Sequence, residues 1–394
     1  MSHKGFAVSA AAAREFEQGR VQVPLASVSA WSALEPGQPL RDLDPAGRPI
    51  GLGLADPEND CLRLLARADE AVDAIDEAFV AGRVKRAQTL RATLGLTGEG
   101  CAFRLLNGSG DGLPGFTADV FGSWAVLHVY ARGLVPLGRQ VADAMRAHAG
   151  VRGVVIKVRS RGAASQGRIR QDIVGDAPPE TLTVFEEGVP FEVHLATGLN
   201  VGLFTDMRTH RHGLARFVRG RSVLNGFAYT GSLSVVAARA GASAVTSVDL
   251  SAGVLNWARD NFVLSGLDPA QAMYRFAADD VGRYVANAAR DRRTYDVIVL
   301  DPPTFSAARG ASFSIERDYA PLIAAAAGVV SAGGVLWLAC NTREISLTAI
   351  AQAGLQRAGR EAQLLETGGL PPDYPTVLGH PEDRYLQVGV FRVV

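Results

Sequence analysis

Asp301, Pro302 and Pro303 are the residues of this sequence whose types and spacing best suit ligand chemistry. They follow residues 297–300, an apolar run rich in β-branched side chains, as is typical of a strand buried on both faces of a parallel sheet. Proline has no backbone N–H, so the strand must end there, at the sheet edge where α/β proteins bind ligands. Asp301 can accept hydrogen bonds from an amino group, and Phe305 offers a ring for stacking. The pattern indicates a base-sized site, although Asp-Pro-Pro also suits a plain strand-ending turn.

A glycine turn upstream has the features of a nucleotide-binding turn. A short strand at 223–224 leads into Asn225-Gly226 and then Tyr229-Thr230-Gly231, and the alanine-rich residues 232–240 predict a helix. Glycine lets a backbone approach a ligand closely, and the start of a helix presents free N–H groups. The turn lacks the GxGxxG pattern, so by itself it is a weak signal.

Acidic residues end the next two predicted strands. Residues 244–248 are followed by Asp249, about 20 residues beyond the glycine turn, where a carboxylate binds a ribose diol in nucleotide-binding folds. Residues 274–277 are followed by Asp279 and Asp280. Because the carboxyl ends of parallel strands share one edge, a nucleoside-containing ligand is expected beside Asp301.

Together these motifs resemble those of class I S-adenosylmethionine-dependent methyltransferases, specifically the RlmI-like family of large-subunit ribosomal RNA methyltransferases. The segments that carry the resemblance are LNGFAYTGSLSVVAA, SVDLS, NWARDNFVLSGL, YDVIVLDPPTFS and GGVLWLACNTREIS, with FEVHLATGLNVGLFTDMRTHR (191–211) before them and DGLPGFTADVFGSW (111–124) in a middle domain. The resemblance implies a doubly wound, seven-stranded, Rossmann-like α/β domain. It also implies S-adenosyl-L-methionine as cofactor and 23S ribosomal RNA as partner.

The resemblance also assigns site residues. It places Phe204 and Asp206 in the wall of the donor pocket, with Arg208 close by. The expected donor-binding residues are Phe204, Asp206, Asn225, Phe227, Tyr229, Thr230, Gly231, Asp249, Leu250, Asp279, Asp280 and Asp301. Pro302, Pro303 and Phe305 are expected to hold the acceptor base, and no metal site is expected.

Cys340 ends the predicted strand at 333–339, on the same sheet edge as Asp301. Carbon-5 of a pyrimidine becomes nucleophilic only after a nucleophile adds to carbon-6, and a cysteine thiolate is suited to that addition. The thiol would need a lowered pKa, with help from Arg343, the donor's charge or a helix end, while Asp301 would hold the cytosine. The alternative is that Cys340 is a small apolar strand residue, and Asn341 replaces the serine that usually follows this cysteine in cytosine-methylating relatives.

Three alternatives remain open. DPPTFS and NTR also resemble the related guanine-N7 methyltransferase domain, where no cysteine is needed because N7 is already nucleophilic. A small-molecule methyltransferase would not require the long region upstream of the catalytic domain. An RNA-binding protein with an inactive catalytic domain would not require an intact donor pocket.

Three domains are expected to position these residues. Residues 1–69 contain short runs punctuated by glycine and proline at 21–24, 39–43 and 49–54, and they resemble the small PUA β-barrel, which binds RNA. Residues 70–188 predict a mixed α/β middle domain, and residues 189–394 the methyltransferase domain. A generic β module is the alternative for the first domain.

Two groups of basic residues precede the catalytic domain. The helical pattern at 70–94 places Arg83, Lys85, Arg86 and Arg91 on its solvated face, with contact to phosphate as the alternative. Residues 151–170 read as a Gly/Ser-rich loop and form the best candidate for binding RNA phosphates, against the alternative of a merely solvated loop. Its cations are Arg152, Lys157, Arg159, Arg161, Arg168 and Arg170.

The composition of the chain limits how it could bind RNA and which classes of protein it could belong to. The chain has 394 residues, 47% of them hydrophobic, and its 40 basic residues balance 40 acidic ones, so an RNA-binding surface must come from local clusters. Three scattered cysteines argue against a disulfide framework, and no apolar run reaches the ~20 residues of a membrane span. A cytoplasmic protein is expected, and the sequence leaves open whether it forms a homodimer.

Overall fold

The computed structural model describes residues 5–159, 170–198, 200–308 and 311–394, and among these it leaves aside the side chains of residues 170, 305–308 and 311–312. The chain forms two compact units. The N-terminal unit comprises Met1–Phe185, His194–Val201 and Pro372–Asp383, and the C-terminal unit comprises Glu186–Val193, Gly202–Pro371 and Arg384–Val394.

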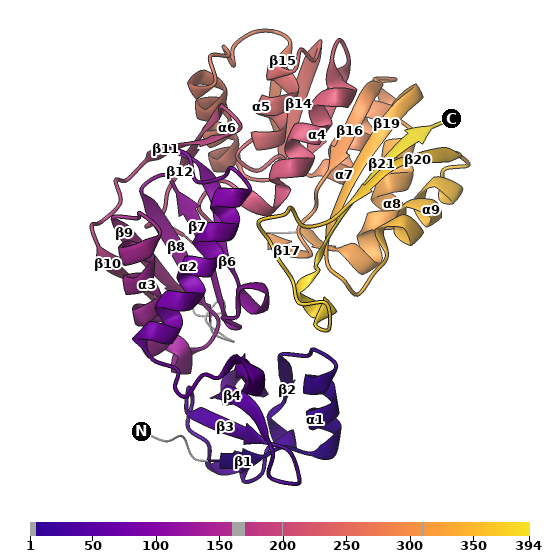
Figure 1. The fold of residues 1–394 in the computed structure, drawn as a ribbon. Coiled ribbons are helices and arrows are strands. Elements are labelled where there is room, and N and C mark those ends of the chain that lie inside the picture. The colour runs from indigo at the N-terminus through magenta and orange to yellow at the C-terminus, as the bar shows by residue number, and fades with distance from the viewer. Residues whose placement is uncertain (1–4, 160–169, 199, 309–310) are drawn as a thin grey trace. The chain divides into compact units, whose positions relative to one another are not determined.

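The start of the chain forms a five-stranded sheet with one helix (Figure 1). Its strands, in spatial order, are β1 (Gly5–Ala7), β3 (Pro39–Leu43), β4 (Pro49–Asp56), β5 (Cys61–Arg67) and β2 (Gln22–Pro24). Helix α1 (Ala10–Glu17) begins after Ser9, whose hydroxyl accepts a hydrogen bond from the Ala12 N–H and caps the helix. Phe16 of this helix belongs to the same apolar cluster as Leu40 and Leu62 of the sheet. The predicted β structure of this region is confirmed.

A second five-stranded sheet follows in the same unit. Its strands, in spatial order, are β10 (Arg170–Gly175), β9 (Gly153–Val158), β8 (Trp124–Val129), β7 (Phe116–Phe121) and β6 (Ala102–Asn107), and its helices are α2 (Glu77–Thr93) and α3 (Val135–His148). Leu127 and Val154 of the sheet lie in one apolar cluster with Val84 of α2 and Met145 of α3. Because side chains alternate along a strand, His128 points to the opposite face of the sheet from Leu127.

Two of the four basic residues expected on the solvated face of α2 are buried. Arg83 and Arg91 are 7% and 0% exposed, whereas Lys85 and Arg86 are exposed. The Arg91 guanidinium forms a bidentate ion pair with Asp111, with N–O distances of 2.5 and 2.8 Å. The prediction was therefore wrong for these two arginines, because helical spacing alone does not reveal acidic partners outside the helix, which are Glu70 for Arg83 and Asp111 for Arg91.

The C-terminal unit contains the predicted seven-stranded sheet, which is confirmed. Its strands, in spatial order, are β15 (Tyr274–Ala278), β14 (Ala244–Asp249), β13 (Ser222–Gly226), β16 (Tyr295–Leu300), β19 (Val330–Asn341), β21 (Leu386–Val393) and β20 (Ala362–Gly368). The first five strands are parallel to one another, and β21 is antiparallel to both β19 and β20. The strand order reverses direction between β13 and β16, which is where an open α/β sheet binds its ligand.

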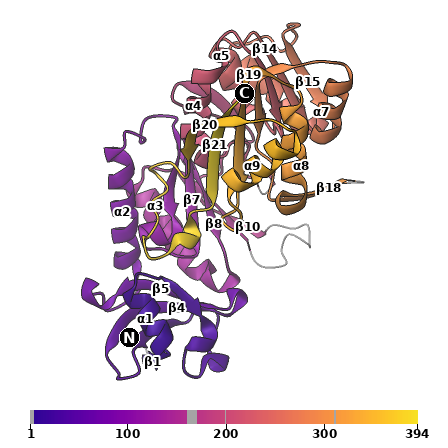
Figure 2. The ribbon, with the colours of Figure 1, turned by 90° about the vertical axis from the view of Figure 1, so that its right-hand side faces the viewer.

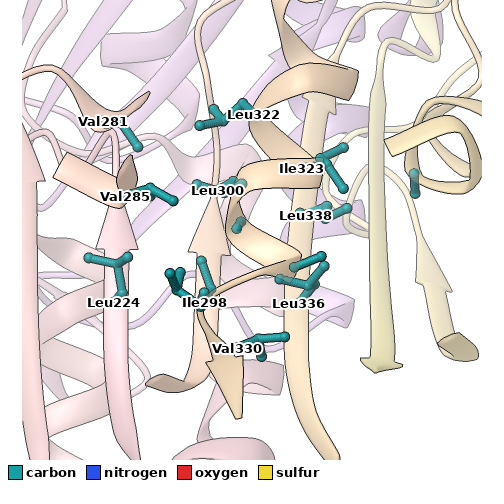
Figure 3. Close-up of a cluster of buried hydrophobic side chains, with 14 of the residues drawn as sticks. Leu224, Val281, Val285, Ile298, Leu300, Leu322, Ile323, Val330, Leu336 and Leu338 are labelled. Carbon is teal, nitrogen blue, oxygen red and sulfur yellow. The ribbon is translucent and has the colours of Figure 1, made fainter. Parts of the chain in front are cut away.

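Helices cover both faces of this sheet (Figures 1 and 2). They are α4 (Arg208–Val218), α5 (Ser232–Arg239), α6 (Ala252–Leu264), α7 (Val281–Arg290), α8 (Ile315–Ala327) and α9 (Leu347–Arg357). Figure 3 shows Leu224, Ile298 and Leu336 of three adjacent strands pointing toward Val285 of α7 and Ile323 of α8. All five side chains are fully buried, so this apolar layer fixes the strands whose ends carry the polar residues.

Two short strand pairs complete the fold. Strands β17 (Phe305–Ala308) and β18 (Ala311–Ser314) form an antiparallel hairpin directly after Asp-Pro-Pro. Strand β11 (Leu182–Glu186) ends where the chain enters the C-terminal unit, and β12 (Val189–Val193) follows it. In the part of the chain that the structure describes, no helix has the length and apolar character needed to cross a membrane.

Candidate active site

The glycine turn joins β13 to α5 and adopts an unusual backbone. Phe227 and Tyr229 have φ angles of 59° and 48°, in the left-handed region that non-glycine residues seldom adopt. Gly231 has a φ of 76°, and a Cβ atom there would lie 2.8 Å from the Cβ of Ala258 in α6. Strain of this kind gathers at ligand-binding sites, so the turn is a specialised one rather than a plain strand-to-helix connection.

Asn225 lies beneath the turn and is 1% exposed. Its amide nitrogen donates to the Ser234 hydroxyl at 2.9 Å, and the Ser247 hydroxyl lies 2.7 Å from the same oxygen. These contacts join β13, β14 and α5 below the ligand edge. Asn225, predicted to bind the donor, therefore supports the turn from underneath.

Asp249 lies at the carboxyl end of β14 and holds the turn in place. Its carboxylate accepts hydrogen bonds from the backbone N–H groups of Tyr229 at 2.9 Å and Ser251 at 3.0 Å. Each carboxylate oxygen has further acceptor capacity, so the group can also bind the two hydroxyls of a ribose. Leu250, the next residue, is 46% exposed.

The two acidic residues after β15, Asp279 and Asp280, have different roles. Asp280 is the N-cap of α7, and its carboxylate accepts a hydrogen bond from the Arg283 N–H at 2.8 Å. The Asp279 carboxylate pairs with the Arg283 side chain, and the Asp279 N–H donates to the Asp249 carbonyl at 3.0 Å. The structure thus brings Asp279 to the donor edge and gives Asp280 a capping role.

Three aromatic rings surround the turn. The ring of Phe204, which is 45% exposed, lies 5.4 Å from the Tyr229 ring, and the Trp257 ring lies 6.4 Å from Tyr229. The Thr230 hydroxyl donates to the Gly202 carbonyl, 2.5 Å away, which attaches the segment containing Phe204 to the turn. Trp257 was not among the predicted site residues, although it lies within the motif NWARDNFVLSGL.

Asp206 and Asp301 are two carboxylates at the switch point of the sheet. Asp206 accepts a hydrogen bond from the Tyr385 hydroxyl at 2.8 Å. Burial raises the pKa of Asp301 to about 7, the negative charge of Asp206 adds to this effect, and Arg211 opposes it. A cationic ligand beside both groups would relieve their repulsion, so this edge suits the ammonium of an amino-acid moiety.

The loop after Asp301 is attached to the end of β19. The Thr304 hydroxyl donates to the Asn341 carbonyl at 3.0 Å. The hydroxyl of Tyr319, a residue of α8, lies 2.9 Å from the carbonyl oxygens of both Leu300 and Ala339. Asp301 and Cys340 are thereby held on neighbouring strand ends, as the sequence predicted.

The predicted acceptor-binding residues differ in how far the structure describes them. Pro302 is buried, and Pro303 is exposed. The side chain of Phe305 lies outside the described residues. Phe313, in the same hairpin, places its ring 5.4 Å from that of Phe227 in an edge-on arrangement. Phe227, predicted to bind the donor, thus faces the hairpin.

Cys340 is fully buried and belongs to the apolar cluster against which Phe227 and Phe313 pack. Its thiol lies 4.0 Å from the Thr342 carbonyl oxygen. Burial raises the pKa of the thiol, and the negative charge of Asp301 raises it further, although the contact with Thr342 opposes both. Without the donor's positive charge, the surroundings of Cys340 thus raise the pKa of the thiol, and its expected lowering in the presence of the donor stays a prediction.

The basic segment predicted at 151–170 belongs to the N-terminal unit and is only in part a loop. Residues 153–158 form β9, where Lys157 is fully buried and donates to the Gly198 carbonyl at 3.0 Å. Burial lowers the pKa of Lys157 to about 8, with a contribution from Arg159. Lys157 was thus wrongly assigned to a phosphate-binding loop, because a buried lysine within an apolar strand is rare.

The other cations of this segment are partly engaged. Arg152 pairs with Asp176 at 2.8 Å, and Arg159 donates to a ring nitrogen of His128 at 3.0 Å. Arg161 and Arg168 lie outside the described residues, as does the side chain of Arg170.

Comparisons with known proteins agree with this geometry. A family model described as S-adenosylmethionine-dependent methyltransferase matches residues 129–383. The "Ribosomal RNA large subunit methyltransferase I" of Klebsiella pneumoniae (strain 342) is 31% identical over 368 residues, which cover 91% of this chain and 90% of that protein. The protein of the same name from Shewanella denitrificans is 32% identical and covers 88% of both chains. A solved structure described as SMU.776, a putative methyltransferase complexed with SAH, is 23% identical and superposes with a TM-score of 0.87 over 99% of this chain and 100% of that one.

Proposed function

The chain belongs to the S-adenosylmethionine-dependent methyltransferases of the RlmI-like family, and from that membership we propose that it methylates a base of 23S ribosomal RNA. The observation that carries the proposal is the extent of the match. Relatives named for the large ribosomal subunit align over 91% of this chain, including most of the region upstream of the catalytic domain. A small substrate would not require that region.

S-adenosylmethionine supplies an electrophilic methyl group when bound. The residues at the sheet edge fit this donor, because Asp249 offers a carboxylate for ribose hydroxyls and Asp206 and Asp301 form an anionic pair for an ammonium. We assign Phe204, Tyr229, Leu250 and Asp279 to the walls of the donor site. Asn225 and Asp280 act indirectly, through the turn and through the start of α7.

We propose cytosine carbon-5 as the acceptor and Cys340 as the nucleophile. The thiolate adds to carbon-6 of the ring, and the resulting electron-rich carbon-5 takes the methyl group. A base then removes the carbon-5 proton, and the bond between sulfur and carbon-6 breaks to release the thiolate. Asp301, with a pKa of about 7, can either donate a hydrogen bond to a ring nitrogen or accept one from the amino group.

Guanine N7 is the second candidate acceptor, and the burial of Cys340 favours it. A protonated thiol within an apolar cluster is a poor nucleophile, whereas N7 attacks a methyl donor without covalent help. In that case Asp301, Pro303 and the hairpin after them would only position the purine.

The N-terminal unit would supply the affinity for RNA. We propose that residues 1–69 are a PUA-like RNA-binding domain, residues 70–188 a middle domain, and residues 189–394 the catalytic domain. Arg159, Arg161, Arg168 and Arg170 would contact phosphates from the middle domain. A ribosomal RNA substrate implies a cytoplasmic enzyme.

Methyl transfer from a labelled donor tests this function. The full-length protein should label large-subunit ribosomal RNA but neither small-subunit ribosomal RNA nor transfer RNA. Labelling of a small molecule with no incorporation into ribosomal RNA would refute the proposal. The variant Asp249→Asn should lose most incorporation, which ties the label to the donor site described above.

A further inference from the structure

We propose that a cavity in the N-terminal unit binds one nucleotide of single-stranded RNA, with its phosphate at Arg83 and Arg86 and its base against Leu90. The proposal rests on the proposed function, because that function makes RNA the substrate. The cavity has a volume of about 390 Å³. Ligand pockets of proteins span roughly 300–1,000 Å³, so the space suits a single nucleotide.

Three elements form the cavity. Strand β5 contributes Leu64, Leu65 and Arg67, helix α2 contributes Arg83, Arg86 and Leu90, and the glycine turn after β6 contributes residues 109–112. The lining therefore combines apolar side chains with cationic ones. A nucleotide likewise combines a flat, weakly polar base with an anionic phosphate.

Arg83 lies in the wall of the cavity and carries a hydrogen-bond donor that has no partner among the described residues. Its side chain is 8% exposed, and its terminal nitrogen binds the Leu65 carbonyl at 2.6 Å and the Glu70 carboxylate at 2.8 Å. The Nε atom is buried and has no hydrogen-bond partner among the described residues. A buried N–H without an acceptor costs about 1–3 kcal/mol, so a ligand oxygen at this position would remove that cost.

The backbone of Gly112 packs closely against the Arg83 side chain. Its φ of 71° lies in the left-handed region, and a Cβ atom at this position would lie 2.8 Å from the Arg83 Nε atom. Glycine therefore lets the turn approach Arg83 closely, and Gly112 itself lines the cavity beside the guanidinium.

Arg86 supplies a positive charge that is available to a ligand. Its side chain is exposed, and no hydrogen bond or ion pair engages it within the described part of the chain. The two acidic residues of the lining are already neutralised, because Glu70 pairs with Arg83 and Asp111 pairs with Arg91. The positive charge of Arg86 is therefore uncompensated, as a phosphate contact requires.

Fluorescence anisotropy with a labelled oligouridylate tests the site in the full-length protein. Two pairs of variants, on α2 and at the residue that ends it, provide matched controls. Arg86→Gln removes a cation from the cavity, and Lys85→Gln removes the neighbouring exposed cation, which does not line it. Leu90→Ala removes part of the apolar wall, and Leu94→Ala removes a side chain of similar exposure, 37% against 36%, outside the cavity.

The cavity variants should weaken binding and the control variants should not. We expect Arg86→Gln to reduce affinity about tenfold and to lower the slope of log affinity against log salt by about one, the effect of one lost phosphate contact. Leu90→Ala should reduce affinity several-fold without changing that slope. Lys85→Gln and Leu94→Ala should bind like the wild type.

Equal binding by Arg86→Gln and Lys85→Gln would overturn the proposal, whether both are normal or both are weakened. Failure of the wild type to bind the probe would overturn it as well. Methyl transfer by the same preparation separates the two claims. If either of these binding results is found and the wild type still methylates ribosomal RNA, only the cavity proposal is contradicted. If the wild type neither binds the probe nor methylates ribosomal RNA, the cavity proposal and the proposed function are both contradicted.

Discussion

Arg211 and Glu186 form a bidentate ion pair that is almost completely buried in the C-terminal unit. The two N–O distances are 2.8 and 2.7 Å, and the side chains are 2% and 0% exposed. The same guanidinium donates to the Phe204 carbonyl at 2.9 Å and to the Ser232 hydroxyl at 3.2 Å. The pair therefore fixes both the segment that carries Phe204 and the first residue of α5, between which the glycine turn lies.

Glu186→Gln should destabilise the C-terminal unit by about 3–5 kcal/mol, the usual cost of leaving one charge of a buried pair without its partner. It should also weaken donor binding, because the Phe204 segment loses its anchor. The exposed pair of Arg216 and Glu366 is the matched control, and Glu366→Gln should cost at most about 1 kcal/mol. Denaturant unfolding measures both effects, and equal stability of the two variants would contradict this role.

Asp249→Ala should weaken donor binding by at least ~1 kcal/mol, about a fivefold loss of affinity, because the turn and the ribose lose the same acceptor. Asp268→Ala is the control, since Asp268 is exposed and its carboxylate accepts a local hydrogen bond from the Ala270 N–H. Calorimetry with S-adenosylmethionine gives the two affinities. Unchanged affinity in Asp249→Ala would remove Asp249 from the donor site.

Donor affinity should increase as the pH rises through about 7. Asp301 has a pKa of about 7 in the folded protein, so it is largely protonated below that pH and carries the charge that attracts an ammonium only above it. The increase should approach tenfold per pH unit below the pKa, and Asp301→Asn should abolish it. A pH profile that is the same in both proteins would show that Asp301 does not contact the donor.

Asp42 should lower the stability of the N-terminal unit at neutral pH. Its carboxyl group is fully buried, neither oxygen has a hydrogen-bond partner among the described residues, and burial raises its pKa well above the usual value. A raised pKa means that the folded state binds the proton more tightly than the unfolded state. Stability is therefore lost as the pH rises above ~4, the value in the unfolded chain.

Asp42→Asn should remove this loss and stabilise the protein at neutral pH by at least ~1 kcal/mol. Asp69→Asn, at an exposed position, should have no such effect. Thermal unfolding across a pH series measures the difference. A stability profile for Asp42→Asn that parallels that of the wild type would mean that the carboxyl group has a partner in solution.

Local patterns predicted parallel strands of the large sheet, and the resemblance to the family implied that there are seven strands. The apolar run before Asp301 and the acidic residue at the end of β14 each encode a strand and its end, and the edge at which they meet follows from the parallel order. The residues that depend on distant partners could not be predicted in this way. The Arg211–Glu186 pair joins residues 25 positions apart, and nothing in the spacing of either one indicates the other.

The burial of side chains at the site could not be predicted from local patterns. Asn225 and Cys340 both lie at strand ends that reach the ligand edge, which made them candidates for ligand contact. The structure shows that their side chains are 1% and 0% exposed. Which way the last side chain of a strand points depends on the helices that cover each face, and those contacts are not local in sequence.

Mass spectrometry of the nucleosides from treated large-subunit ribosomal RNA tests the central claim most directly. The wild type and Cys61→Ala, which alters a buried cysteine of the N-terminal unit, should both produce cytosine methylated at carbon-5. Cys340→Ala should produce none, because the adduct at carbon-6 cannot form. Methylguanine that persists in Cys340→Ala would contradict the covalent mechanism and identify a purine as the acceptor.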